Sequence, residues 1–168
     1  MGTLMKGEKI REIGTHILAL YYKKKYFEKY KLILDEIEEL KKFLKDLTLR
    51  EFYEEIGIEF TCTAADLDNH ILRFFNHKTT PDLPIVYAIQ MTGSLPLAFE
   101  SQHWKRNWGK YYVHYEKSRR EIDLIKDGVG CQFSDGGVLD NFPVRFLDNP
   151  KMRPKYFAHP RNKFSSSG

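Results

Sequence analysis

Apolar residues recur every three or four positions along the first fifty residues, and this spacing predicts helices. Between residues 7 and 22 they mark one face of an amphipathic helix. From about residue 24 to residue 47, steps of four and three form a heptad seam of about three repeats. The seam either binds a partner, covers a site as a lid, or packs on its own domain. Its members are Tyr26, Tyr30, Ile33, Ile37, Leu40, Leu44 and Leu47.

A third helix is predicted directly after this seam. Thr48 and Glu51 have the spacing of a capping box, in which each side chain bonds the backbone N–H of the other. The helix is expected to run from residue 49 to about residue 56 and to end at Gly57, because glycine readily adopts the left-handed conformation that closes helices.

Short extended and helical segments alternate in the next forty residues. Residues 58–64 are rich in β-branched and aromatic types and predict a strand, which turns at 66–69 into a hairpin partner at 70–75. After Pro84, which suits the first turn of a helix, the apolar positions of residues 85–92 share one helical face. This part of the chain therefore mixes helix and strand.

One acidic turn is the strongest candidate for chemistry. Asp135, followed by two glycines, stands at the end of the short apolar run 129–133. Asn141 can bond within its own turn, and Pro143 keeps the segment out of a strand ladder. The pattern fits an acid held rigidly for catalysis, and it also fits an ordinary hairpin, since Asp-Gly is a strong hairpin signal.

Three segments taken together resemble patatin-like phospholipases: residues 58–67, 80–99 and 135–143. The family pattern there reads roughly as a strand closing in Ala-x-Asp-Leu, a helix closing in Ala-x-x-x-Ser-x-x-x-Pro-x-x-Phe, and Asp-Gly-Gly-x-x-x-Asn-x-Pro. The resemblance implies an α/β protein, the C-terminal portion of a three-layer α/β/α patatin-like fold. On this basis the chain divides into a helical segment (1–47), the patatin-like part (48–147) and a basic, proline-containing tail (148–168).

The resemblance also implies a function and roles for the residues of the acidic turn. Patatin-like enzymes hydrolyse lipid acyl esters with a serine–aspartate dyad, without histidine, metal or other cofactor. Asp135 matches the dyad aspartate, which would take the serine's proton as general base. Gly136 and Gly137 would let the serine come close, and Asn141 and Pro143 would hold the turn. The expected partner is a phospholipid or another acyl-ester lipid.

The chain departs from the family pattern at the nucleophile. No Gly-x-Ser-x-Gly occurs, since Ser94 has neither glycine at the required positions and Ser134 lacks the first, and the glycine-rich oxyanion loop is missing too. The lack of oxyanion donors by itself is expected to lower the rate by about 10²–10³-fold. We therefore expect this chain to supply the acid, to need a serine-bearing half, and to be inactive alone. The alternative is a non-catalytic, degenerate module that binds lipid surfaces or other proteins.

Aromatic and basic residues stand together in the segment after residue 99. Trp104, Lys105, Arg106 and Trp108 form a combination that settles at lipid headgroups, so they are candidates for membrane contact. The alternative is a surface β-excursion whose tryptophans pack on the domain.

Composition narrows the remaining classes. The 168 residues, 42% hydrophobic, suffice for one domain with a core, and a net charge of +4 does not favour nucleic acid as a partner. Cys62 and Cys131 fit no metal spacing, and neither do His70 and His77. No apolar run has the length of a membrane span, which predicts a cytoplasmic protein, soluble or peripheral at membranes.

Overall fold

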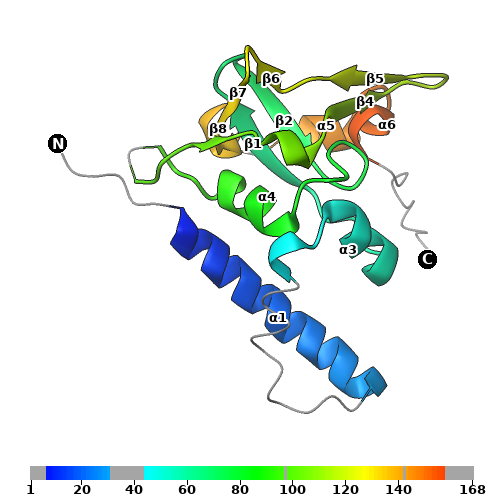
Figure 1. Cartoon of the computed structure of the whole chain (residues 1–168). Helices are drawn as coiled ribbons and strands as arrows, with labels where there is room; N and C mark the ends of the chain where they lie inside the picture. Colours follow the sequence, from blue (N-terminus) through cyan, green and yellow to red (C-terminus); the bar gives the residue numbers. More distant parts are fainter. Residues whose placement is uncertain (1–6, 31–43, 97, 142, 158–168) are drawn as a thin grey trace.

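The computed structural model describes residues 7–30, 44–96, 98–141 and 143–157 (Figure 1). Helix α1 (Glu8–Tyr30) runs without a break past the point near residue 23 where the sequence predicts two helices. The heptad seam between residues 31 and 43 lies outside the described residues. At its described end Leu44 and Leu47 are buried in the core, so that end of the seam packs on its own domain.

Helix α3 (Leu49–Ile56) has the predicted capping box. The Glu51 N–H donates to Thr48 Oγ1 at 3.2 Å, and the Thr48 N–H donates to Glu51 Oε2 at 2.8 Å. The Thr48 N–H and the Thr48 hydroxyl both donate to the Glu51 carboxylate at 2.8 Å, and these two bonds lower the pKa of Glu51. Gly57 closes the helix with a φ of 73°, in the left-handed region that favours glycine. The predicted start and end of this helix are confirmed.

A four-stranded antiparallel sheet forms the centre of the described chain, in the order β2-β1-β8-β3. Its strands are β1 (Cys62–Asp66), β2 (Ile71–Phe75), β3 (Gln102–His103) and β8 (Gln132–Asp135). The predicted hairpin between β1 and β2 is confirmed. Strand β1 starts and ends later than residues 58–64, so its last residue, Asp66, belongs to the ladder instead of the turn.

Helices cover both faces of the sheet. Consecutive strand residues point to opposite faces, and Phe74 and Phe75 show what lies on each. Phe74 packs on α5 (Val144–Asp148) and α6 (Arg153–Tyr156), where its ring lies 5.0 Å from Phe146 and 5.1 Å from Tyr156. The opposite face, which carries Phe75, is covered by helix α4 (Ile85–Thr92). Cys62 stands opposite Phe75 in the ladder and contacts this helix. The α/β fold class is confirmed.

Helix α1 lies against α4, on the side away from the sheet (Figure 1). The Arg11 guanidinium donates to Gln90 Oε1 across this contact at 3.3 Å. Ile13, Ile17 and Leu20 are 50–62% exposed, so part of the apolar face of α1 is uncovered by the described residues. Within those residues, no helix combines the length and the apolar character that crossing a membrane requires.

Short elements fill the region between α4 and β8. They are η2 (Arg106–Trp108), β4 (Tyr111–His114), β5 (Arg119–Ile122), β6 (Ile125–Lys126) and β7 (Val129–Gly130). Beyond β8, helix α6 falls in the segment interpreted from sequence as a tail. Phe157 after it is buried, with its ring 5.3 Å from that of Phe74. The packed domain therefore continues at least to residue 157.

Candidate functional site

Asp135 stands at the last position of β8, where the sheet gives way to a loop. It pairs with Ala64 of β1, and its N–H donates to the carbonyl of Ser94 at 3.0 Å. The chain then enters a short 3₁₀ helix, η3 (Gly136–Val138), for which Asp135 is the N-cap. The Asp-Gly pair thus starts a helical turn and not the hairpin that was the alternative from sequence.

The Asp135 carboxylate is held at one oxygen. Oδ1 accepts the N–H of Gly137 at 2.8 Å, while Oδ2 accepts no hydrogen bond from the described residues. The residue is partly exposed, so a group from outside these residues can reach it. A carboxylate fixed at one oxygen and open at the other has the arrangement that a general base requires.

The two glycines after Asp135 differ in what surrounds them. A Cβ on Gly136 would lie 2.4 Å from Thr63 Oγ1 and 2.9 Å from the Thr63 carbonyl carbon, so only glycine fits there against β1. A Cβ on Gly137 would lie 3.0 Å from Asn141 Oδ1, which places the Asn141 side chain against the turn. Pro143 follows as the N-cap residue of α5. The loop from Asp135 to Pro143, named here the acid loop, is thus packed at its start by β1.

Neither serine near the acid loop is placed as a nucleophile. Ser94 is fully buried, and its hydroxyl donates to the Gln90 carbonyl at 2.6 Å. The Ser134 hydroxyl donates to the Ser94 carbonyl at 2.8 Å. That carbonyl therefore accepts both the Ser134 hydroxyl and the Asp135 N–H, and so ties the end of α4 to the acid. Sequence reasoning missed this role, because no local pattern shows which carbonyl a strand end meets.

The region interpreted as a membrane contact splits into buried and exposed residues. Trp104 and Trp108 are 2% and 1% exposed and lie in the hydrophobic core. Lys105 and Arg106 are exposed, and the Lys105 ammonium lies 4.5 Å from the centre of the Tyr87 ring. The tryptophan burial agrees with the alternative of a packed surface excursion. Contact with lipid headgroups by the two basic residues stays a prediction.

Truncation of a buried tryptophan separates these interpretations. We expect Trp108→Ala to lower the free energy of unfolding by about 3–5 kcal/mol, because it empties a core position. Urea denaturation measures this loss. Leu95→Ala, at a side chain that is 55% exposed, is the control and should change the stability by less than about 0.5 kcal/mol. A folded Trp108→Ala protein of unchanged stability that no longer pellets with liposomes would contradict the packing role.

A cluster of possible metal ligands lies at the turn after β1. Oxygens of Asp66 and Asp68 and the sulfur of Cys131 lie within 4.8 Å of one another. Each is already engaged: Asp66 accepts from Arg73, Asp68 Oδ2 accepts the N–H of Gln132, and the sulfur of Cys131 accepts from the Asn69 amide. These bonds explain the cluster as part of the fold.

Comparisons with known proteins agree with the fold class. The family model described as patatin-like phospholipase matches residues 22–148. The chain is similar to the "Probable lipid hydrolase 463L" of Invertebrate iridescent virus 6, with 23% identity over 105 residues. That match covers 62% of this chain and 28% of the viral protein, so the chain spans well under half of this relative's length. No solved structure gives a significant match.

The family model matches most of the chain and includes the whole acid loop. The chain therefore belongs to the patatin-like phospholipase family, whose members act on lipids. The family resemblance inferred from residues 58–67, 80–99 and 135–143 is confirmed.

Proposed function

We propose that this chain is the acid-bearing part of a patatin-like lipid acyl hydrolase. Asp135 serves as the general base of a serine–aspartate dyad, and the serine comes from a polypeptide segment outside this sequence. The base takes the proton of the serine hydroxyl as the oxygen attacks the ester carbonyl and forms an acyl-serine. It then takes a proton from the water that releases the fatty acid. The protein works in the cytoplasm, free or peripherally at a membrane.

The geometry of Asp135 is the observation that supports this proposal. Its backbone is tied to Ser94, and one carboxylate oxygen is tied to Gly137. Gly136 brings the loop against Thr63 without a side chain between them. A base must be held within hydrogen-bond reach of the proton it removes, and this loop fixes the acid while leaving one oxygen open.

On this proposal the 168-residue polypeptide alone has no hydrolase activity, since the sequence holds no Gly-x-Ser-x-Gly elbow and neither Ser94 nor Ser134 is placed to attack an ester. We expect no turnover above buffer when it is incubated with a short-chain nitrophenyl ester or with phospholipid vesicles. The release of nitrophenolate and of titratable acid measures this. Turnover that disappears in the Asp135→Ala variant would contradict the prediction, because it would show a nucleophile within this chain.

The second candidate is a non-catalytic module that binds a lipid surface or a protein. The exposed face of α1 favours it, because Ile13, Ile17 and Leu20 lie along one line of the helix with half or more of each side chain exposed. Liposome binding by a longer, serine-bearing protein that shows no ester hydrolysis would support this candidate over the enzyme.

A further inference from the structure

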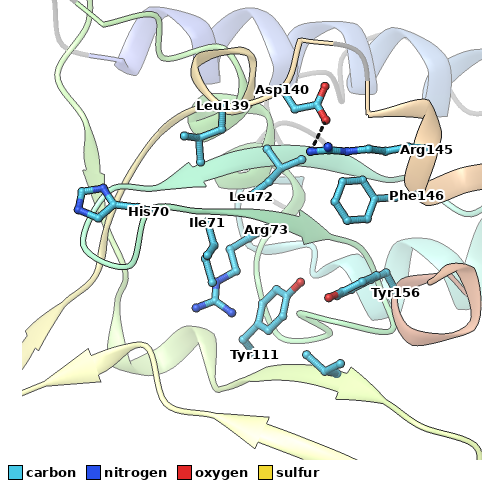
Figure 2. Close-up of a pocket in the computed structure, with 11 residues that line it drawn as sticks. His70, Ile71, Leu72, Arg73, Tyr111, Leu139, Asp140, Arg145, Phe146 and Tyr156 are labelled. Carbon is cyan, nitrogen blue, oxygen red and sulfur yellow. Dashed lines mark ion pairs between the residues drawn. The ribbon is translucent and has the colours of Figure 1, made fainter. Parts of the chain in front are cut away.

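A cavity lies beside the acid loop, along β2, the edge strand of the four-stranded sheet. It has a volume of about 440 Å³, within the usual range of small-molecule pockets. Its walls come from β2, β4, the acid loop, α5 and α6, and Figure 2 shows their side chains around a common space. The acid loop contributes Leu139 and Asp140, and Asp135 is not part of the lining. The cavity is thus separate from the proposed base.

A buried arginine forms the polar end of this cavity. The side chain of Arg73 is 7% exposed, and Asp66 accepts its Nε at 3.0 Å and its Nη2 at 2.9 Å. Nη1 makes no hydrogen bond within the described part of the chain. The guanidinium also lies 4.8 Å from the centre of the Tyr111 ring. Asp66 therefore fixes the arginine and leaves one of its amino groups as a donor.

Two tyrosine hydroxyls add donors near this arginine (Figure 2). The Tyr111 oxygen accepts the N–H of Phe74 at 3.2 Å and donates to none of the described residues, so its hydrogen is available. Burial raises the pKa of both Tyr111 and Tyr156, so both hydroxyls stay protonated at neutral pH. Together with Nη1 of Arg73, these hydroxyls are donors that can bind the oxygens of an anion.

The charges of the lining cancel in pairs. Arg73 is paired with Asp66, and at the rim Arg145 is paired with Asp140 at 3.1 Å. The Arg145 side chain is 73% exposed and the Asp140 side chain 18% exposed, so this pair adds no net charge to the rim of the cavity. With no large excess of positive charge, the cavity favours a single negative charge over a polyanion.

Apart from His70, the rest of the lining is apolar. Beside the polar end described above, the cavity is lined by the apolar side chains of Leu72, Val113, Leu139 and Phe146. A free inorganic anion would leave these walls in contact with water, whereas an aliphatic tail would bury them.

We propose that this cavity binds the carboxylate of an aliphatic acid, with Arg73, Tyr111 and Tyr156 holding the anion and Leu139 and Phe146 covering the tail. The ligand class is a monoanionic amphiphile with the chemistry of a free fatty acid. The inference goes beyond hydrolysis, since it concerns binding at a site that does not contain Asp135.

Titration calorimetry with decanoate below its micellar concentration tests the proposal on the full 168-residue chain. We expect one saturable site, with binding about tenfold or more tighter than that of nonyltrimethylammonium, which has the same nine-carbon tail and the opposite charge. Acetate, a carboxylate without a tail, should show no saturation. Absence of saturable decanoate binding, or equal binding of the cationic amphiphile, would overturn the proposal.

Two neighbouring residues of the acid loop provide a matched pair of variants. Leu139→Trp fills the cavity and should weaken decanoate binding by about tenfold or more, whereas Val138→Trp, at a half-exposed residue outside the lining, should change it by less than about twofold. Equal effects of the two would place the ligand elsewhere. Circular dichroism checks that both variants fold.

A third variant decides the question if Leu139→Trp does not fold. Tyr156→Phe removes one hydroxyl and keeps the ring that packs on Phe74, so the fold is retained. We expect it to weaken decanoate binding by about three- to tenfold and to leave the binding of the cationic amphiphile unchanged. An unchanged decanoate affinity would contradict the assignment of the anion to this end of the cavity. All these readouts measure binding without turnover, so their failure leaves the hydrolase proposal intact.

Discussion

Replacement of Asp135 by asparagine in a polypeptide that includes the serine is expected to lower kcat for a short acyl ester by about 10²–10⁴-fold. The asparagine amide has the shape of the carboxylic acid, and its oxygen can still accept the Gly137 N–H, so the loop should keep its conformation. It cannot take a proton from the serine or from water. The measurement is the initial rate of nitrophenyl ester hydrolysis at saturating substrate.

Asp148→Asn is the matched control for this experiment. Asp148 is an exposed acid on α5, outside both the acid loop and the cavity lining, and its variant removes the same charge. The rate of ester hydrolysis by the Asp148→Asn variant should stay within about twofold of the rate of the unsubstituted protein. Similar rates for Asp135→Asn and the unsubstituted protein would show that another group acts as the base.

The second large effect is expected on stability. Asp66→Ala should lower the free energy of unfolding by about 3–5 kcal/mol, because it leaves the Arg73 charge buried without a partner. Asp66 also accepts the N–H and the side-chain amide of Asn69, at 3.1 and 2.9 Å, so the turn after β1 loses its anchor as well. Urea denaturation followed by circular dichroism measures the change.

An exposed ion pair in the same protein provides the comparison. Asp82 bonds Arg50 at 2.7 Å, with the two side chains 44% and 51% exposed, and such pairs contribute at most about 1 kcal/mol. Asp82→Ala should therefore cost far less than Asp66→Ala. In the double variant Asp66→Ala/Arg73→Met, part of the loss should return, because the unpaired charge is gone. Equal losses in the free energy of unfolding for Asp66→Ala and Asp82→Ala would contradict the account of the buried pair.

Local signals in the sequence predicted the local elements well. The capping box at Thr48 fixed the start of α3, Gly57 fixed its end, and the apolar face after Pro84 predicted α4. These signals act through bonds between residues at most four positions apart, so they can be read without the fold. At the acid loop, local signals left an ordinary hairpin and a rigidly held acid open, and the catalytic interpretation of Asp135 came from the resemblance of three segments to patatin-like phospholipases.

Contacts between distant segments account for what the sequence did not show. Strand β1 extends to Asp66 because the ladder with β2 and β8 continues there, and Arg73 compensates the buried acid. The segment that forms helix α6 was interpreted as a tail because it is rich in proline and basic residues, yet Phe157 packs on Phe74, more than eighty positions earlier. Such pairings depend on which strands become neighbours.

The cavity beside the acid loop could not be predicted for the same reason. Its donors Arg73, Tyr111 and Tyr156 come from three elements separated by more than thirty residues each, and no motif joins them. The membrane interpretation of Trp104 and Trp108 relied on residue type alone. In the fold both rings are buried, with their centres 5.4 Å apart.

The most direct test of the central claim is the intact mass of the protein from its natural source, before and after treatment with a fluorophosphonate that labels activated serines. The account predicts a product clearly heavier than 19.9 kDa that gains one probe, with labelling lost in the Asp135→Asn variant. A product of 19.9 kDa that stays unlabelled would contradict it, and would mean that the acid loop belongs to a protein without hydrolase chemistry.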